Sequence, residues 1–571
     1  MMELRKNIGY VIGALGILAA FFLFSRYFLQ TSADLFALPL LAFYSFYRMF
    51  FAYVLSLLFS LVYGYYAATN KRAAKAMLLI LDVLQSVPIL GFFPAAVFLI
   101  VSTFNGSVLG LEIASIFLIF TSMVWNMTFD VYESLITIPK DVLAASKAFG
   151  LKRFLLFKNL ILPATIPKLI YNSMISWAGG WYFLIASEII SLGSTTHKLP
   201  GIGSYLLETT ARGDIPASLL GLGTLMLIII AMDLLIWRPL TVWSDKFKYE
   251  STKGKGGMKS AVYSFYKWSP AMIAARKILS KAYDSLLDDM EKIVEWVEKK
   301  NLFNRNYRRA FNIVRYGALI IALALLLNGF WLILSLALSI AFEPLPVEAY
   351  EIPLALAYSF VRLVVAFIIA LAWTLPTAIF VMRNPSYRRF LVPFFEIIAA
   401  IPSPALFPII ILFALFATKS LGFAAILLIM TGMQWYLLFN AMAGVRNLPT
   451  DLDEAAGAFG VKGNLYYRRV FIPAMLPSLI TGCITAFGGG WNALVIAEYV
   501  RFAGCEGGVC MVTGIGSFLS KTTYSTVLAP SVQAKLIFLS LLAMVAAIFL
   551  MNHFFWRKIY NHVLKRYRLE G

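Results

Sequence analysis

The chain has 571 residues, of which 60% are hydrophobic and only 14% are charged. Soluble domains average roughly 45–50% apolar and 25% charged residues, so this composition excludes a water-soluble fold. In a soluble protein the net charge of +20 would suggest a nucleic-acid ligand. Here Lys and Arg gather in alternate loops between apolar stretches, as the positive-inside rule requires of cytoplasmic segments, and nucleic acid is therefore not the expected partner.

Apolar stretches of about 20 residues, the length that crosses a bilayer, occur six times before residue 241 and six times after residue 312. The sequence therefore predicts an all-α polytopic membrane protein with about 12 transmembrane helices in the plasma membrane. The basic loops place both termini in the cytoplasm. The first stretch lacks a small-residue cleavage site and is interpreted as a span, not as a signal peptide. The expected spans are 8–29, 42–68, 76–102, 108–131, 163–190, 216–240, 313–341, 354–382, 390–417, 420–442, 473–498 and 530–556.

The chain contains one long internal repeat. YSFYR at 44–48 recurs as YSFVR at 358–362, and after a short shift of register IPKDVLAASKAFG at 138–150 matches LPTDLDEAAGAFG at 448–460. Each half has an even number of predicted spans, so both halves have the same orientation in the membrane. This indicates a parallel duplication, with the substrate path between the fused halves.

A polar segment separates the two halves and gives three expected domains. They are a first half at 1–240, a cytoplasmic connector at 241–311 and a second half at 312–571. Apolar residues recur at helical spacing among the charges of the connector, which predicts an amphipathic helix. We interpret it as a spacer helix on the membrane surface or on the transporter body, with a regulatory role as the alternative.

The repeated loop carries the most informative motif. In the second copy, Asp451 can cap a short helix and Gly460 can end it in a left-handed conformation. Ala455 and its small neighbours allow a partner protein to approach the helix closely, while Phe459 offers it a large apolar side chain. These features predict a cytoplasmic docking helix for a partner protein. A plain loop helix is the alternative, but it would not explain two copies at equivalent places.

This loop resembles the EAA loop of permeases of ATP-binding cassette (ABC) importers, with the pattern E-A-A, three residues, G, and then an apolar-Pro pair. The first copy is degenerate, because Ala144 stands where the family has Glu and Ser146 replaces the second Ala. The resemblance implies two ATPase subunits docked on the cytoplasmic side. The expected docking residues are Asp141, Ala145, Phe149, Gly150, Asp451, Glu454, Ala455, Ala456, Phe459 and Gly460.

Further motifs resemble those of permeases for nitrate, sulfonates, taurine and related anions. These permeases carry S-x-x-R in the second span, W-x-x-x-x-A-E in the fifth, and G-[IL]-G outside it; this chain has each motif twice. The resemblance implies import of a small anion such as nitrate, a sulfonate, taurine or bicarbonate, delivered by an extracytoplasmic binding protein and driven by ATP hydrolysis on separate subunits. A non-anionic substrate and a secondary transporter or channel are the alternatives. The fusion, the connector and a longer outer loop at 499–529 depart from the pattern.

The sequence contains no G-x-x-x-x-G-K-[ST] motif, so the chain is not expected to be an enzyme, and ATP and Mg²⁺ are expected only on the partner ATPases. The three His residues are scattered, which gives no metal site. Cys505 and Cys510 lie in an outer loop and are expected to form a local disulfide. Cys483 is expected to be packed within a span.

Several residues are candidates for the substrate path. Arg48 and Arg362 occupy equivalent positions near the outer ends of two spans, where they either form an electropositive mouth for an anion or extend toward the membrane surface. Glu188 and Glu498 are expected near the outer surface, paired with these arginines or in contact with the binding protein. The remaining candidates line the path or pack in the core or against lipid; they are Trp125, Trp181, Trp435 and Trp491.

Overall fold

The computed structural model describes most of the two predicted halves. It covers residues 32–86, 106–149, 153–188, 199–247, 342–446, 450–461, 463–501, 509–523 and 527–567, with isolated residues in some of the gaps. The predicted span at 8–29, most of the span at 313–341 and the connector beyond residue 247 lie outside the described residues.

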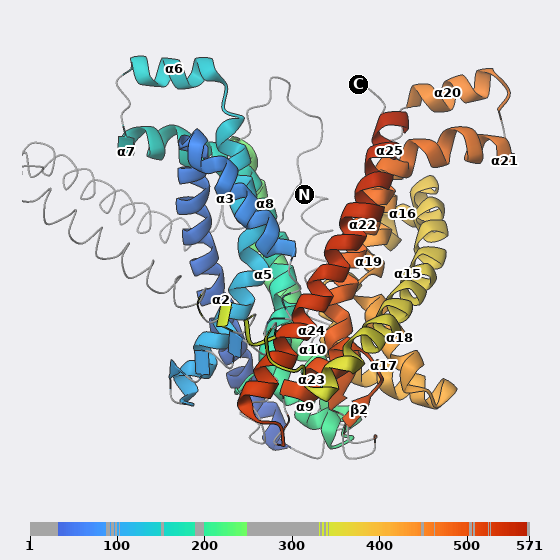
Figure 1. The fold of residues 1–571 in the computed structure, drawn as a ribbon. Coiled ribbons are helices and arrows are strands. Elements are labelled where there is room, and N and C mark those ends of the chain that lie inside the picture. The colour runs from blue at the N-terminus through green and yellow to red at the C-terminus, as the bar shows by residue number, and fades with distance from the viewer. Residues whose placement is uncertain are drawn as a thin grey trace, which may run out of the picture. The chain divides into compact units, whose positions relative to one another are not determined.

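The first half is built from long apolar helices joined by short ones (Figure 1). Apolar runs form helices here because lipid offers no partner for backbone N–H and C=O groups, which a helix satisfies internally. The described elements are α2 (Ser32–Thr69), α3 (Lys71–Ser86), α5 (Val108–Ile136), α6 (Lys140–Ala148), α7 (Arg153–Leu156), η1 (Phe157–Ile161), α8 (Leu162–Glu188), α9 (Ile202–Ala211), α10 (Ile215–Met232), η2 (Asp233–Trp237), α11 (Arg238–Ser244) and η3 (Asp245–Phe247).

The second half repeats this order of long and short helices. Its helices are η4 (Val347–Glu351), α15 (Ile352–Arg383), α16 (Pro385–Ala399), α17 (Ser403–Thr418), α18 (Leu421–Thr431), α19 (Gln434–Arg446), α20 (Thr450–Ala458), α21 (Gly463–Tyr466), η5 (Tyr467–Phe471), α22 (Ile472–Ala497), α23 (Ile515–Thr523), α24 (Pro530–Leu550), η7 (Met551–Trp556) and α25 (Arg557–Tyr567). Strands β1 (Tyr499–Arg501) and β2 (Val509–Met511) form an antiparallel pair in the loop at 499–529, a feature that the sequence did not predict.

Six helices of the described part are long and apolar enough to cross a membrane, and a seventh span results if the bent pair α18 and α19 counts as one. That pair bends by 41° at Gly432, where an added Cβ would lie 2.8 Å from Ala493 and 3.0 Å from the Gly489 carbonyl oxygen of α22. The predicted span at 390–417 is also divided, into α16 and α17. The all-α membrane fold is therefore confirmed, whereas the total of 12 spans stays a prediction.

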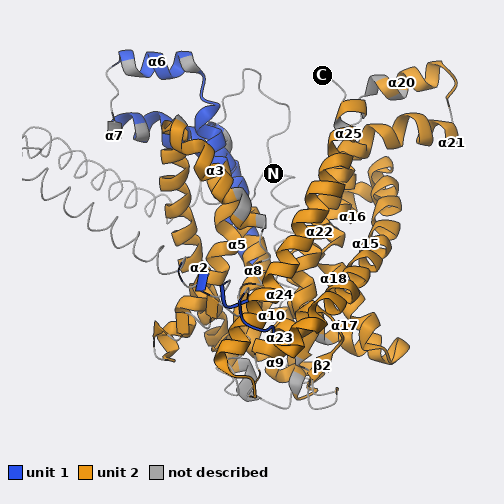
Figure 2. Ribbon diagram, viewed as in Figure 1, with its two compact units in different colours: residues 1–18, 130–172, 231–345 blue, residues 19–129, 173–230, 346–571 orange. Residues whose placement is uncertain are grey.

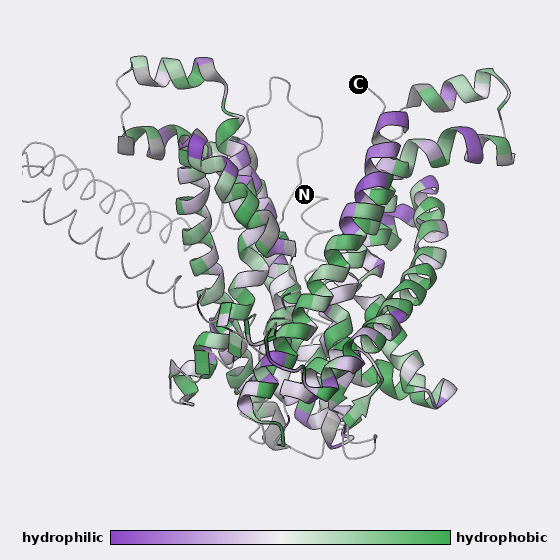
Figure 3. Ribbon diagram, viewed as in Figure 1, coloured by the Kyte–Doolittle hydropathy of each residue, from purple (hydrophilic) through white to green (hydrophobic). Residues whose placement is uncertain are grey.

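The chain divides into two compact units that do not coincide with the two halves (Figure 2). One unit comprises residues 1–18, 130–172 and 231–345, and the other comprises 19–129, 173–230 and 346–571. In the larger unit α15, α19 and α22 pack closely around fully buried small and aliphatic side chains, such as Ala366, Ala370 and Leu437. Small residues let membrane helices approach closely. Within the larger unit, α25 is mostly hydrophilic, whereas the long helices are mostly apolar (Figure 3).

Candidate docking loops and transport pathway

The loop of the second half forms the short, sharply ended helix that its sequence predicts. After α20 the chain turns at Gly460, whose φ of +67° lies in the left-handed region. The Phe459 N–H bonds the Ala455 carbonyl at 2.9 Å, and the Val461 N–H bonds the Ala456 carbonyl at 2.8 Å. These bonds satisfy carbonyl groups that would otherwise be left free at the helix end.

The end of α20 presents an apolar side chain to the surroundings. Phe459 is 85% exposed, and Glu454 and Ala455 are also exposed. Ala456 is buried at 6% exposure, so its expected place on the docking surface is wrong: it faces inward and packs in the core of its unit. The side chain of Asp451 lies outside the described residues. The docking role of this loop stays a prediction, and Phe459 is its most exposed apolar side chain.

The first-half loop has the same form without the glutamate. The Phe149 N–H bonds the Ala145 carbonyl at 2.9 Å at the end of α6, and the Phe149 side chain is 86% exposed. Asp141, Ala144 and Ala145 are exposed as well, while Gly150 lies outside the described residues. In both halves a second short helix follows, α7 or α21, and a π-helical segment, η1 or η5, leads into the long helix (Figure 1).

Arg48 lies at the centre of a buried ion-pair network. Its side chain is 0% exposed. Nε and Nη2 each donate to one oxygen of Glu112 at 2.7 Å, which is the bidentate geometry that a planar guanidinium favours. Nη1 donates to Glu188 Oε1 and to the Pro200 carbonyl, both at 2.8 Å. Every guanidinium nitrogen thus has a partner within the protein.

Glu188 is held by a cradle of small residues and backbone. Ser45 Oγ donates to Oε1 and the Gly203 N–H donates to Oε2, both at 2.7 Å. A Cβ on Gly201 would lie 2.2 Å from Oε1, so the carboxylate fits only because this residue is glycine. The cradle gives a physical reason for three separate motifs: the serine and arginine of α2, the glutamate that ends α8, and the G-I-G at the start of α9.

The second half builds the same cradle with one carboxylate fewer. Glu498 accepts from Ser359 Oγ at 2.7 Å and from the Gly516 N–H at 2.8 Å, and a Cβ on Gly514 would lie 2.2 Å from its Oε2. Arg362 pairs with Glu498 and donates to the Thr513 carbonyl at 2.9 Å. The α18 sequence, LGFAAILLIMT, contains no acidic residue to take the place of Glu112. Accordingly, the Arg362 side chain is 12% exposed, compared with 0% for Arg48.

These contacts correct the expected role of the arginines as an anion-binding mouth. Arg48 is shared between Glu112 and Glu188, so its network carries no excess positive charge, and its complete burial also rules out extension toward the membrane surface. Arg362 is neutralised by Glu498. Of the two roles expected for Glu188 and Glu498, pairing with the arginines is the one that the structure shows.

Sequence reasoning did not single out Glu112. The available signal was an acidic residue within an otherwise apolar helix, because such a residue needs a partner or an aqueous surrounding. It also missed the role of the glycines at 201, 203, 514 and 516, which depends on a contact with a residue far away in the sequence.

The four candidate tryptophans have different surroundings. Trp181 and Trp491 are buried, at 1% and 2% exposure. Trp435 packs among aromatic rings, with the Trp373 centroid at 6.4 Å. Trp125 has a buried Nε1 that finds no hydrogen-bond partner among the described residues. Trp491 lines a small cavity. The role of the four tryptophans on a substrate path stays a prediction.

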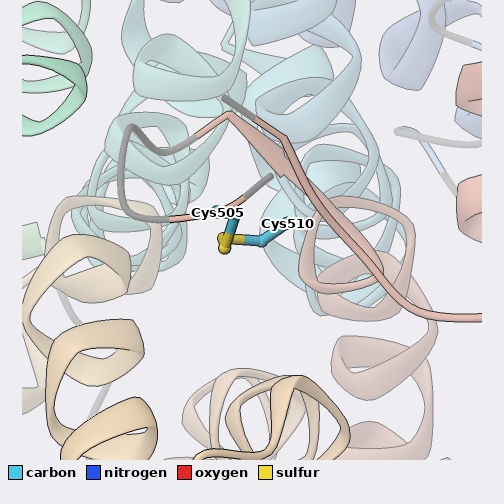
Figure 4. Close-up of a disulfide and its surroundings, with 2 residues drawn as sticks. All are labelled: Cys505 and Cys510. Atoms are coloured by element: carbon cyan, nitrogen blue, oxygen red, sulfur yellow. A yellow bond between two sulfur atoms is a disulfide. The ribbon is translucent and has the colours of Figure 1, made fainter. Parts of the chain in front are cut away.

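Cys505 and Cys510 are joined in a disulfide (Figure 4). Cys510 lies on β2 opposite Val500 of β1, so the bond closes the loop between the two strands. Cys483 is a buried free cysteine in α22.

Two regions of the chain, residues 60–237 and 364–560, match the family described as the binding-protein-dependent transport system inner membrane component. The chain belongs to that family. The two matches place one family unit in each half of the duplication and show that the chain is a fused ABC importer permease. As an inner membrane component with several apolar helices, it is a multi-pass membrane protein.

The chain is also similar to individual anion permeases. It is 31% identical over 161 residues to the bicarbonate transport system permease protein CmpB of Synechococcus elongatus, covering 28% of this chain and 54% of the relative. The nitrate import permease protein NrtB of Leptolyngbya laminosa is 29% identical over 29% of this chain and 54% of its own length. The taurine transport system permease protein TauC of Escherichia coli is 29% identical over 35% and 76%. The chain thus spans about half the length of the bicarbonate and nitrate relatives.

Proposed function

We propose that this chain is the translocation subunit of an ABC importer, with both halves of the path fused in one chain, and that it carries a small anion across the plasma membrane with energy from ATP hydrolysed on separate subunits. The observation that carries the proposal is the pair of docking helices, α6 and α20, each followed directly by an exposed phenylalanine. Two equivalent docking helices in one chain match the two ATPase subunits of such an importer. Both termini then lie in the cytoplasm, and 12 spans bring both docking loops to the cytoplasmic side.

The described geometry supports a way to transmit force from the ATPases. Each docking helix is followed by a second short helix, α7 or α21, and then by the π-helical segment η1 or η5, which leads into α8 or α22. Single-turn π-helical segments are rare and often occur at functional sites. Closure of the ATPases moves α6 and α20, and these segments pass the movement to the long helices, which opens the path alternately to each side.

The proposals that the substrate is an anion and that an external binding protein delivers it are supported by the similarity to named permeases. Their names specify bicarbonate, nitrate and taurine, each a small molecule that bears an anionic group. The family description specifies dependence on a binding protein. The networks of Arg48 with Glu188 and of Arg362 with Glu498 stabilise the ends of α8 and α22. We therefore expect other residues to determine which substrate is bound.

The two docking sites are expected to contribute unequally. Glu454 is exposed and can form polar contacts with an ATPase, whereas Ala144 offers none at the equivalent position. We expect Glu454→Ala to weaken co-purification of the cognate ATPase about tenfold, as for the loss of one charge-assisted hydrogen bond. The matched variant Ala144→Glu is expected to strengthen it.

The measurement is the amount of ATPase retained on the immobilised full chain at increasing salt. Glu454→Gln, which keeps a hydrogen-bonding group, should retain more ATPase than Glu454→Ala. If changes at 144–149 release more ATPase than changes at 454–459, the asymmetry is wrong; if neither loop affects retention, the proposed function itself loses its support.

A further inference from the structure

Arg383, the last residue of α15, lies over three aromatic rings of α21 and η5, the two segments that lead into α22. Its guanidinium carbon is 4.6 Å from the ring centroid of Phe471 and 4.9 Å from those of Tyr466 and Tyr467. Nη1 also donates to the Tyr467 hydroxyl at 2.8 Å. A planar guanidinium stacks on aromatic rings and is attracted to the negative charge of their faces. The arginine thus attaches the end of α15 to the docking loop of the second half.

The three rings also pack against one another. Their centroids lie 5.7 Å apart for Tyr466 and Tyr467, 6.1 Å for Tyr466 and Phe471, and 5.5 Å for Tyr467 and Phe471. Phe471 is 1% exposed and Tyr466 is 8% exposed, whereas Arg383 is exposed. The rings are therefore held in place by packing, and the arginine binds to them from outside.

A second arginine attaches the other end of α15 to α22. Arg362 pairs with Glu498, the residue that ends α22. Arg362 and Arg383 are 21 positions apart, which is about 32 Å along a helix and therefore close to the thickness of the hydrocarbon core. Both ends of α15 are thus joined to the two ends of α22, by an ion pair at one end and by arginine–aromatic contacts at the other.

The repeat-equivalent position of the first half holds no cation. It is Thr69, whose hydroxyl donates to the Tyr65 carbonyl of its own helix at 2.8 Å. The positions that correspond to Tyr466 and Tyr467 hold Leu156 and Phe157. The arginine–aromatic attachment therefore belongs to the second half alone.

The division into compact units differs between the halves in the same way. In the second half, α15, α20, α21, η5 and α22 all belong to the larger unit. In the first half, α2 belongs to the larger unit, whereas α6, α7 and η1 belong to the other one. The docking loop and the long helices of the second half thus form one packed body.

We propose that Arg383 is a positioning residue for coupling: it fastens the cytoplasmic end of α15 to η5, so that α15 and α22 move as a rigid pair when an ATPase displaces α20. The proposal rests on the importer function proposed above. The chain itself carries the movement from α20 to α22, and the contacts of Arg383 pass it on to α15. The second half then transmits more of the ATPase movement than the first, in line with the unequal docking expected at Glu454.

The first test measures whether α15 and the docking loop stay together. Spin labels are attached at Ser386→Cys and Leu465→Cys, two exposed positions that lie just after α15 and within α21. The native cysteines do not react, because Cys483 is buried and the other two are joined in the disulfide. Pulsed electron paramagnetic resonance gives the distance between the labels in nanodiscs, with the cognate ATPase and with or without ATP.

The unmodified chain should give one narrow distance distribution that ATP does not shift. Adding Arg383→Leu should broaden the distribution in the chain alone and make its mean change when ATP binds. A distribution in the Arg383→Leu chain that matches the unmodified one would overturn the proposal.

The second test measures the uptake of labelled bicarbonate, nitrate and taurine per ATP hydrolysed, in proteoliposomes with the ATPase and binding protein. Arg383→Leu should lower this ratio about tenfold, as for the loss of one hydrogen bond and several cation–π contacts. The amount of ATPase retained on the immobilised chain should not change. Arg383→Lys keeps the charge without the planar stacking and should restore part of the ratio, and Tyr467→Phe, which keeps the ring, should lower it less.

Two variants serve as matched controls. Arg388→Leu removes an exposed arginine of α16, and Thr69→Leu changes the repeat-equivalent position of the first half; neither should alter the uptake per ATP. An equal loss in Arg388→Leu would assign the effect to net charge and overturn the proposal. A loss of ATPase retention in Arg383→Leu would do the same, because Arg383 would then act in docking itself.

The proposed function can fail separately from this attachment. Absence of ATP-dependent uptake of all three anions by the unmodified system argues against the importer function, while the distance measurement still tests the contact between α15 and η5. ATP-dependent uptake that Arg383→Leu leaves unchanged keeps the importer function and removes the coupling role of Arg383.

Discussion

Replacing Arg48 by leucine is expected to destabilise the protein by about 3–5 kcal/mol, because removing one partner of a buried ion pair leaves charge in a place without water. Two carboxylates lose their partner at once: Glu188, which is 0% exposed, and Glu112, which is 18% exposed. Arg48→Lys should cost less, since it keeps the charge, but one ammonium group cannot reproduce the planar contacts with Glu112, Glu188 and the Pro200 carbonyl.

The second half provides the matched comparison. Arg362→Leu leaves a single carboxylate, Glu498, at a partly exposed arginine, and is therefore expected to destabilise less than Arg48→Leu. Thermal unfolding of the purified chain in nanodiscs, followed by tryptophan fluorescence, measures both. Adding Glu188→Gln to Arg48→Leu should recover part of the loss, because the double variant no longer buries that unpaired charge. Normal stability of Arg48→Leu together with impaired anion transport would instead restore Arg48 to the substrate path.

Replacing Gly460 by valine is expected to abolish coupling to the ATPase that docks at α20. At a φ of +67° a β-branched residue is strongly disfavoured, so the turn must change and the exposed Phe459 is displaced from its place at the end of the helix. An added Cβ meets nothing within 4 Å, so the effect comes from the backbone and not from a steric clash with neighbouring side chains. ATPase activity that depends on the permease should fall at least tenfold, while the melting temperature changes little.

A control for this variant exists elsewhere in the chain. Gly106 has a similar φ of +74° and also meets nothing within 4 Å, but lies in a loop predicted to face outside. Gly106→Val introduces the same backbone strain and should leave the ATPase activity unchanged. Equal loss in both variants would mean that strain anywhere in the chain impairs coupling, which would remove the special role of Gly460.

Local signals in the sequence were sufficient to predict the long helices and the short helix with its glycine turn in the second docking loop. In the described part of the chain six apolar runs form helices long enough to cross a membrane. Gly460 adopts the left-handed conformation that its place after a short helix implies. The bends were not predictable in the same way. The break at Gly432 depends on the close approach of α22, and hydropathy alone does not reveal such a contact.

The networks around Arg48 and Arg362 show where reasoning from single residues failed. An arginine near the end of a span suggested an anion site, but its role depends on partners 64 and 140 residues away in the sequence, Glu112 and Glu188. Only the folded chain brings these charges together.

Reconstituted transport tests the importer function most directly. The full chain is placed in proteoliposomes, with or without its cognate ATPase and binding protein, and uptake of labelled bicarbonate, nitrate and taurine is measured. Our account predicts uptake of one of these anions only when the ATPase, ATP and the binding protein are all present. Robust uptake by the chain alone, driven by an ion gradient, would contradict it.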